Sequence, residues 1–326
     1  MDRPRVFVTR ALPGDAPLTQ LREHADVDVW EGDAPPTRDE LLARVRGARG
    51  VLAMLTERID GEVMDACDQL VVVANMAVGY DNVDVAAATA RGVLVTNTPD
   101  VLTETTADMA FALLLASARR VVEGDQMVRD GGWGAWQPTW MLGHEVHGAT
   151  LGIVGGGRIG RATAERGRGF GMRVLYHSRH TVPGFPGERV ELDTLLAESH
   201  FVSVHVPLTD ETRGMFNAAL FAQMRHDAIF INTARGGVVD QPALLDALQR
   251  GVIAGAGLDV MVPEPLPPGD PLLMAPNLVV TPHLGSSTEP TRVAMAALAV
   301  DNLLTALAGE RPRNLVNADA WRHRES

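Results

Sequence analysis

The sequence predicts an α/β fold with two doubly wound parallel-sheet domains and a cleft between them. Short apolar runs alternate with amphipathic segments along most of the 326 residues, which is the pattern of strand–helix–strand units in a parallel sheet covered on both faces. The series starts again at Thr150, after a long helical stretch. A chain of this length exceeds the usual size of one hydrophobic core, so we expect two domains.

The residues up to Pro99 predict the first sheet. Its expected strands read RVFVT, VDVW, VLAML, LVVVANM and VLVTNT. A helix is expected after Thr37, because Thr37 and Glu40 have the spacing of a capping box. One long helix, with the apolar stripe MAFALLLASA, is then expected from about Thr103 to Arg129.

The residues from Thr150 onward predict the second sheet. Its expected strands read TLGIV, RVLYH, FVSVHV, AIFINTA, IAGAGLDV and NLVVTPH. The helices between them are expected from Arg158, near Leu192 to Glu198, near Phe221 and from Gln241 to Gln249. A last helix, Thr288 to Ala308, follows the complete sheet and is free to return to the first domain. We therefore expect a discontinuous domain of residues 1–99 and 287–326 around a second domain of residues 100–286.

Composition and charge narrow the class of protein. The net charge of −12 argues against binding to nucleic acid or to an anionic membrane, because most of the surface would repel phosphate. The single cysteine, Cys67, allows neither a disulfide framework nor a cysteine zinc site, and we expect no metal. The N-terminal residues lack the apolar stretch of a secretory signal, and no apolar run is long enough to cross a membrane, so the cytoplasm is the expected location.

The glycine-rich loop GGGRIG is the first functional motif. Gly155, Gly157 and Gly160 have the G-x-G-x-x-G spacing, directly after an apolar strand and at the start of a helix. Glycine is required there because a side chain would block the turn, the approach to a pyrophosphate and the packing of helix on strand. In this strand–loop–helix context we expect a dinucleotide site that includes Arg158 and Ile159.

The end of the next strand indicates which dinucleotide binds. An NAD site usually has an Asp or Glu roughly 20 residues after the glycine loop to bind the ribose hydroxyls. This chain has Tyr176, His177, Ser178, Arg179 and His180. Without a carboxylate to repel a 2′-phosphate, and with Ser178 and Arg179 to hold it, NADPH is the expected cofactor and NADH is less favoured. The alternative is that these residues form a solvated turn.

The complete series of motifs resembles the D-isomer-specific 2-hydroxyacid dehydrogenases, and within them the glyoxylate/hydroxypyruvate reductases. The segments that carry the resemblance span nearly the whole chain and read LGIVGGGRIG, VHVPLT, NTARGGVVD, AGLDVMVPEPLP and TPHLGSST. It implies a Rossmann-like cofactor domain, a flavodoxin-like substrate domain and a homodimer. The implied reaction is NAD(P)H-dependent reduction of a small anionic 2-oxo acid to a D-2-hydroxy acid.

The resemblance also implies a catalytic set, which agrees with the chemistry of its side chains. Arg235 would hold the substrate carboxylate and polarise the 2-oxo group through charge-assisted hydrogen bonds. His283 would be the general acid and would lie against the substrate. Glu264 would hydrogen-bond this imidazole, orient it and favour its protonated form.

Further contacts follow from the same resemblance. Asp259 would accept a hydrogen bond from the nicotinamide carboxamide, and Arg158 would meet the pyrophosphate. The remaining implied cofactor contacts are Thr106, Pro207, Thr233 and Ala234. In the first domain, the implied substrate contacts are Leu55, Val78 and Gly79, with Asn82 as a brace for the loop. Met261 replaces the usual aromatic residue after LDV and is expected to preserve packing.

The segment GGWGAWQPTWMLGHEVHG is rich in turn residues, and we expect an irregular connection near an interface. In related reductases it can reach the partner subunit's active site, which makes Trp140 a candidate for such a contact. Two alternatives stay open. One is an NAD-dependent D-lactate or other D-2-hydroxyacid dehydrogenase, and the other is a dinucleotide-sensing protein of the same fold. The sequence does not rank the 2-oxo acids, since small differences in pocket side chains decide among them.

Overall fold

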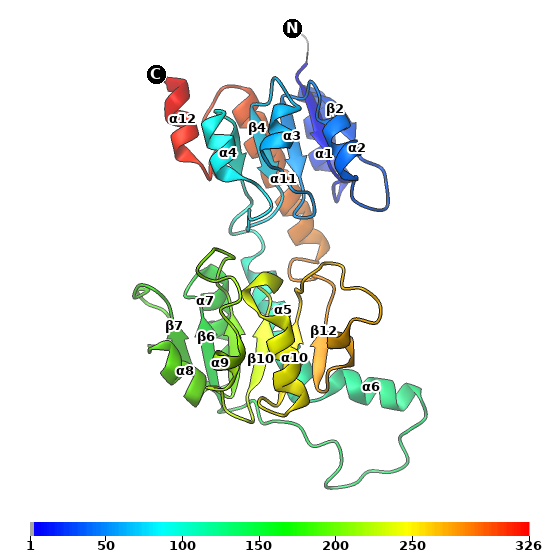
Figure 1. Cartoon of the computed structure of the whole chain (residues 1–326), viewed down its shortest axis with the longest axis vertical. Helices are drawn as coiled ribbons and strands as arrows, with labels where there is room; N and C mark the ends of the chain where they lie inside the picture. The colour runs from blue at the N-terminus through cyan, green and yellow to red at the C-terminus, as the bar shows by residue number, and fades with distance from the viewer. Residues whose placement is uncertain (1–2, 326) are drawn as a thin grey trace. The chain divides into compact units, whose positions relative to one another are not determined.

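A computed structural model of the chain describes residues 3–325, with side chains described for residues 3–322 (Figure 1). It divides into two compact units, which we call unit 1, Met1–Leu102 with Thr288–Ser326, and unit 2, Thr103–Ser287. Within the described residues, unit 1 contains a five-stranded parallel sheet and unit 2 a seven-stranded parallel sheet. The predicted α/β class with two parallel sheets is confirmed.

Unit 1 has the strand order β2-β1-β3-β4-β5, the flavodoxin-like arrangement in which the chain changes direction beside β1. The strands are β1 (Arg5–Val8), β2 (Asp26–Val29), β3 (Gly50–Ala53), β4 (Val72–Asn75) and β5 (Leu94–Thr96). The helices are α1 (Asp15–His24), α2 (Arg38–Arg44), α3 (Gly61–Asp65), α4 (Val85–Ala90), α11 (Glu289–Leu307) and α12 (Ala318–Glu325). The expected capping box is present, because Thr37 and Glu40 bond each other's backbone at the start of α2.

The C-terminal helices complete unit 1. Helix α11 packs on α1, β3 and β4, and α12 packs on α4. Leu303 of α11 is fully buried, and its side chain lies about a van der Waals contact from the Cβ position of Gly50 on β3. Asn317 ties the last segment to β5 by accepting a hydrogen bond from the Val95 amide at 2.8 Å.

Unit 2 has the strand order β12-β11-β10-β9-β6-β7-β8. The strands are β6 (Thr150–Val154), β7 (Arg173–His177), β8 (Glu188–Arg189), β9 (Phe201–Val204), β10 (Ile229–Asn232), β11 (Gly255–Leu258) and β12 (Leu278–Val280). The α-helices after β6 are α7 (Arg158–Gly169), α8 (Leu192–Glu198), α9 (Ala218–Phe221) and α10 (Gln241–Gln249). Every strand predicted for this half is present, whereas β8 was missed because its short, exposed pair of polar residues shows no apolar pattern.

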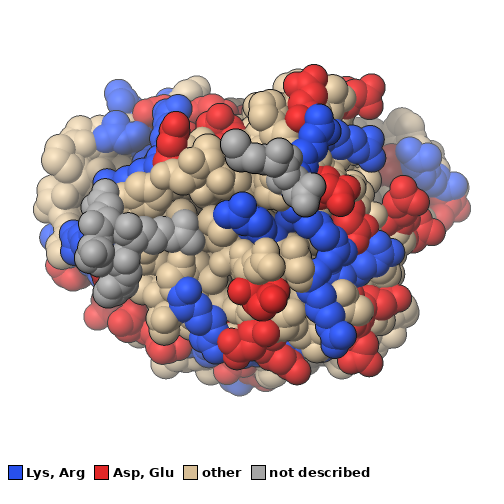
Figure 2. Space-filling view, turned by 90° about the horizontal axis from the view of Figure 1, so that it is seen from above, with Lys and Arg blue, Asp and Glu red and all other residues tan. Residues whose placement is uncertain are grey.

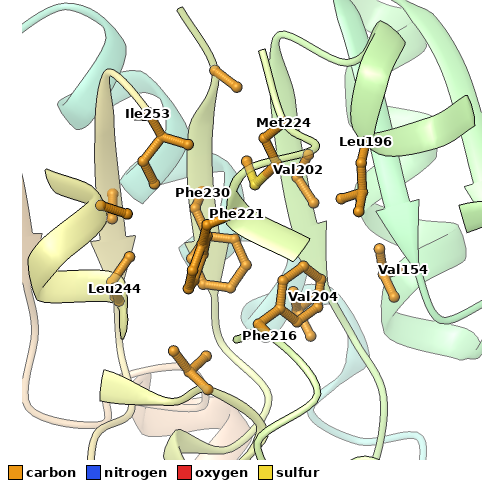
Figure 3. Close-up of a cluster of buried hydrophobic side chains, with 14 of the residues drawn as sticks. Val154, Leu196, Val202, Val204, Phe216, Phe221, Met224, Phe230, Leu244 and Ile253 are labelled. Atoms are coloured by element: carbon orange, nitrogen blue, oxygen red, sulfur yellow. The ribbon is translucent and has the colours of Figure 1, made fainter. Parts of the chain in front are cut away.

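Aromatic rings fill the core on one face of the unit 2 sheet (Figure 3). Phe230 of β10 packs against Phe216 and Phe221, with ring centroids 4.9 and 5.4 Å apart, and all three side chains are fully buried. The other face is covered by α5 (Thr103–Ala118). Gly257 of β11 allows this close approach, because a Cβ there would lie 3.0 Å from the Cβ of Leu113. The sheet is therefore covered on both sides, and its carboxyl edge is left for ligands.

The prediction of one long helix from Thr103 to Arg129 is wrong. The structure has two helices, α5 and α6 (Val121–Arg129), and Arg120 between them adopts a left-handed conformation with φ 52°. The cause is the chain that returns after α6. The His144 amide donates to the Ala118 carbonyl at 2.8 Å, so the last turn of α5 is capped by a tertiary contact. The segment between α6 and β6 contains no helix or strand, as expected.

Charged side chains are mixed on the surface. On the face seen in Figure 2, arginines and carboxylates are interspersed, and every basic residue drawn is an arginine because the chain contains no lysine. Among the described residues, no helix is long and apolar enough to cross a membrane. The same residues contain no group of three or more His, Cys, Asp or Glu side chains suited to hold a metal ion.

Candidate active site

The glycine-rich loop joins β6 to α7 in unit 2. Gly155 has a φ of 112°, and a Cβ there would lie 2.6 Å from the backbone of His205. A Cβ at Gly160 would overlap the carbonyl oxygen of Gly155. At Gly157 no atom lies within 4 Å of the Cβ position. Two glycines are thus required by packing, and the third leaves open space at the helix terminus.

This open space fits a dinucleotide pyrophosphate. Gly157 is the N-cap of α7 and, having no side chain, provides no side-chain cap at this end of the helix. The first amide groups and the helix dipole therefore favour an anion there. Arg158, the first residue of α7, is exposed, and Ile159 follows it half-buried.

The turn after β7 lies beside the glycine loop. The Gly155 amide donates to the His177 carbonyl at 2.9 Å, and the Cβ position of Gly156 is 3.3 Å from the Ser178 side chain. The Ser178 hydroxyl donates to the His180 carbonyl, while Arg179 is exposed. The residues predicted to recognise the adenosine ribose are therefore adjacent to the loop, as a dinucleotide requires.

The loops after β11 and β12 bring Glu264 and His283 together. The His283 Nδ1 is 2.7 Å from the Glu264 Oε2, and both side chains are partly exposed. The other carboxylate oxygen of Glu264 accepts from the Met261 amide at 3.0 Å. His283 has a left-handed backbone with φ 55°, and its amide donates to the Asp259 carbonyl at 2.9 Å. The Nδ1 is occupied by Glu264, which leaves the Nε2 as the nitrogen for chemistry.

The pKa of Glu264 is lowered from its ordinary value. Burial alone would raise this pKa, but the hydrogen bond and the charge of His283 outweigh it, with further help from the Met261 amide and the charge of Arg235. The ionised carboxylate is thus the favoured form, and it stabilises a positive charge on the neighbouring imidazole.

Arg235 follows β10, the strand next to β11. Its backbone is extended, its carbonyl accepts from Asn232 Nδ2 at 2.9 Å, and its Nη1 donates to the Ala234 carbonyl at 2.9 Å. A Cβ on the next residue, Gly236, would overlap the Met261 carbonyl, so glycine is required there. Arg235, Glu264 and His283 therefore come from the carboxyl ends of neighbouring strands, where such sheets bind ligands.

Asp259 has a role that the sequence did not show. Its side chain is only 1% exposed and accepts hydrogen bonds from the Thr281 hydroxyl at 2.6 Å and from the Leu284 and Gly285 amides at 2.7 Å each. These donors lie on both sides of His283, so Asp259 fixes the loop that carries the histidine. Thr106 of α5 lies against the same loop, 3.4 Å from the Cβ position of Gly285.

The other cofactor candidates lie at the same edge of the sheet. Thr233 is buried, and its hydroxyl group has no hydrogen-bond partner within the described part of the chain. The hydroxyl oxygen is therefore a polar atom that a ligand can bond. The Ala234 amide bonds Asn232 Oδ1 at 2.9 Å. Pro207 is exposed, and its carbonyl accepts from Thr212. His205, which the sequence reasoning did not single out, packs its backbone on Gly155, and burial lowers its pKa to about 3.

The candidate substrate residues lie in unit 1. Leu55, just after β3, is 36% exposed. Val78 and Gly79, after β4, are half-buried. Asn82 holds these loops together by donating to the carbonyls of Met54 at 2.9 Å and Glu57 at 3.1 Å. The bracing role expected for Asn82 is thus seen, while Glu57, Asn75 and Asn97, which also contact these loops, carry no motif that would reveal them.

A glycine-rich dinucleotide loop beside an Arg, Glu and His set defines the site of a nicotinamide-dependent oxidoreductase. Comparison with known proteins agrees. Residues 111–285 match the D-isomer specific 2-hydroxyacid dehydrogenase, NAD binding domain family. A relative named glyoxylate reductase from Korarchaeum cryptofilum is 52% identical over 322 residues, which cover 97% of each chain. The chain belongs to the D-isomer-specific 2-hydroxyacid dehydrogenase family.

Solved structures of related proteins have the same fold as this chain. A Thermus thermophilus protein aligns with a TM-score of 0.91 and 52% identity, covering 96% of this chain and 99% of the other. The NADPH-dependent glyoxylate/hydroxypyruvate reductase of Sinorhizobium meliloti, solved with NADP and malonate, aligns with a TM-score of 0.85 and 37% identity over 98% of each chain.

Proposed function

We propose that this protein is an NADPH-preferring glyoxylate/hydroxypyruvate reductase, which converts small 2-oxo acids to D-2-hydroxy acids. The observation that carries the proposal is the His283–Glu264 pair beside Arg235, at the carboxyl ends of β10, β11 and β12. The names of the relatives from Korarchaeum cryptofilum and Sinorhizobium meliloti support the choice of substrate.

Each residue of the set has a separate task in this proposal. The bound dinucleotide supplies the hydride. Arg235 binds the substrate carboxylate and polarises the 2-oxo group. His283 donates the proton from Nε2 to the carbonyl oxygen, and Glu264 holds Nδ1 so that the ring keeps this orientation. Asp259 fixes the histidine loop. Leu55 and the backbone amides of Val78 and Gly79 are the proposed substrate contacts of unit 1.

The preference for NADPH rests on Ser178 and Arg179. A serine and an exposed arginine stand beside the glycine loop, where NAD enzymes usually carry a carboxylate. The remaining proposed cofactor contacts are Thr106, Arg158, Ile159, Pro207, Thr233, Ala234 and Asp259. The Sinorhizobium meliloti relative is NADPH-dependent, which supports the preference.

The test is the initial rate of cofactor oxidation with NADPH and NADH, each with glyoxylate, hydroxypyruvate and pyruvate. We expect fast turnover of the first two acids with NADPH. Arg179→Asp should raise the KM for NADPH at least about tenfold and leave that for NADH within about twofold, since one charge-assisted phosphate contact contributes about 1.5–3 kcal/mol. Arg168→Asp, an exposed arginine near the end of α7, is the matched control.

Three results would contradict the proposal. Equal effects of Arg179→Asp on both cofactors would disprove the 2′-phosphate contact. Cofactor binding without turnover of any 2-oxo acid would favour a dinucleotide-sensing protein, and preference for pyruvate with NADH would favour a D-lactate dehydrogenase.

We also propose that the protein is a homodimer. Helix α6 and the connection that follows it expose several large apolar side chains, and Trp136 is 79% exposed. The other members are Val121, Val122, Val128, Trp133, Trp140 and Leu142. Apolar surface of this kind is usually covered by a partner, and Trp140 is the candidate for contact with the partner subunit's substrate.

A further inference from the structure

The turn after β4 in unit 1 has three successive carbonyl groups anchored to neighbouring residues. The bonds run from Thr98 N to Ala77 O at 2.9 Å, from Asn97 Nδ2 to Val78 O at 2.8 Å and from Asn75 Nδ2 to Gly79 O at 2.8 Å. Thr98 and Asn97 follow β5, and Asn75 ends β4. The backbone of this turn is therefore fixed from the ends of two adjacent strands.

This anchoring sets the direction of the amide groups. In a planar trans peptide the C=O and the next N–H point in opposite directions. The N–H groups of Val78, Gly79 and Tyr80 therefore point away from the residues that hold the carbonyls. No described residue accepts a hydrogen bond from these three amides. Val78 and Gly79 are half-buried, and Tyr80 is exposed. Successive free amides of this kind bind anions.

A second set of bonds ties the loop after β3 to the same turn. Asn75 and Asn82 exchange hydrogen bonds at 3.1 and 3.2 Å, and Asn82 donates to the carbonyls of Met54 and Glu57. The buried Glu57 carboxyl group accepts from the Met54 amide at 3.0 Å and from Thr9 after β1. The network lies at the carboxyl ends of β1, β3 and β4, beside the change of direction in the strand order, where α/β sheets bind ligands.

We propose that Asn97 and Asn75 are positioning residues for the substrate carboxylate. By holding the carbonyls of Val78 and Gly79, they direct the amides of Gly79 and Tyr80 toward the anion, so Tyr80 supplies a backbone donor in addition to Val78 and Gly79. The asparagines do not touch the substrate. This inference rests on the proposed reduction of 2-oxo acids and extends it to the residues that select an anionic substrate.

The test compares a charged and a neutral substrate. In Asn97→Leu and Asn75→Leu we expect kcat/KM for glyoxylate to fall at least about tenfold, chiefly through KM. The value for ethyl glyoxylate, which has no carboxylate, and the KM for NADPH should stay within about twofold. The control is Asn317→Leu, another buried asparagine of unit 1, which donates to the Val93 carbonyl at 2.9 Å. It should lower the melting temperature and leave the ratio of acid to ester unchanged.

A loss of acid and ester turnover in equal proportion, or an unchanged KM for glyoxylate, would overturn the proposal. A second measurement uses the wild-type enzyme alone, in case the leucine variants do not fold. Amide ¹H–¹⁵N spectra of the NADPH complex should show downfield proton shifts at Gly79 and Tyr80 on addition of oxamate. Their absence would also refute the proposal. If the wild type turns over no 2-oxo acid, the proposed function fails, while the oxamate shifts still report whether the turn binds a carboxylate.

Discussion

Glu264 shows how one carboxylate can orient the histidine that is proposed as the general acid while the carboxylate stays ionised. Its Oε2 bonds His283 and its Oε1 bonds the Met261 amide, so neither oxygen is free to rotate away. The positive charge of Arg235 also lowers the pKa of Glu264, and this residue follows β10, the strand next to β11. The carboxylate is thus held in place partly by the imidazole that it is proposed to orient.

Replacement of Glu264 by Gln tests this arrangement. Because the folded pKa of Glu264 is lowered, its contribution to stability is present above its unfolded pKa of about 4.5 and is lost as the pH falls through the lower folded value. The wild type should therefore be more stable than Glu264→Gln at pH 7, and the difference in unfolding free energy should shrink below about pH 4.5. At pH 7, kcat should fall between about tenfold and 100-fold.

Urea unfolding from pH 3 to pH 8 and steady-state kinetics measure both effects. Glu31→Gln, an exposed position in unit 1, is the control and should change neither. A stability difference that is constant across this pH range would contradict the electrostatic account of Glu264.

At the scale of elements, two glycines of α7, Gly160 and Gly169, differ in how closely their Cβ positions approach other atoms. The Cβ position of Gly160 overlaps the Gly155 carbonyl, whereas Gly169 at the other end of α7 has no atom within 4 Å of its Cβ position. Gly160 thus sets how closely the helix approaches the strand, and Gly169 carries no such constraint. The two positions form a matched pair.

Gly160→Ala should displace α7 from the loop and raise the Kd for NADPH at least about tenfold, as expected when a bound pyrophosphate loses an aligned helix terminus. Gly169→Ala should leave this Kd unchanged and stabilise the fold by up to about 1 kcal/mol, since Ala is the better helix former. Fluorescence titration with NADPH and thermal unfolding measure the two quantities. Equal cofactor affinity in both variants would show that the close approach at Gly160 is not needed.

Features that depend on neighbouring residues could be predicted from the sequence, and features that depend on contacts between distant residues could not. Elements with local signals were predicted correctly, such as the capping box at Thr37 and the strand–loop–helix unit around Gly157. The break at Arg120 was missed because its cause, the His144 amide, is distant in the sequence. The motifs led to Arg235, Glu264 and His283, and their roles stay predictions, whereas Asn75 and Asn97 act through bonds that only the folded chain makes.

At the scale of the whole molecule, the exposed apolar side chains of α6 and of the connection that follows it predict that a second copy of the chain covers them. Sedimentation of the wild type should give a dimer. Trp136→Ser with Val128→Ser should shift the equilibrium toward the monomer, because two large apolar side chains would leave the interface. Phe170→Ser, an exposed aromatic outside this surface, is the control. A wild-type monomer at micromolar concentration would contradict the dimer.

Trp140→Ala separates assembly from catalysis. If Trp140 reaches the partner subunit's substrate, this variant should remain dimeric and change the ratio of kcat/KM between glyoxylate and hydroxypyruvate. Unchanged selectivity together with an unchanged oligomeric state would rule out that contact.

The return of α11 to unit 1 has a consequence for synthesis on the ribosome. Unit 2 is one continuous segment and can fold as soon as residue 287 has left the exit tunnel. The segment of unit 1 up to Leu102 must wait, since the face of β3 and β4 that packs on α11 is covered only when Leu303 and the rest of α11 emerge after unit 2. The segment of unit 1 that precedes unit 2 in the chain is thus completed after unit 2, and until then the uncovered face of its sheet exposes apolar surface to which chaperones bind.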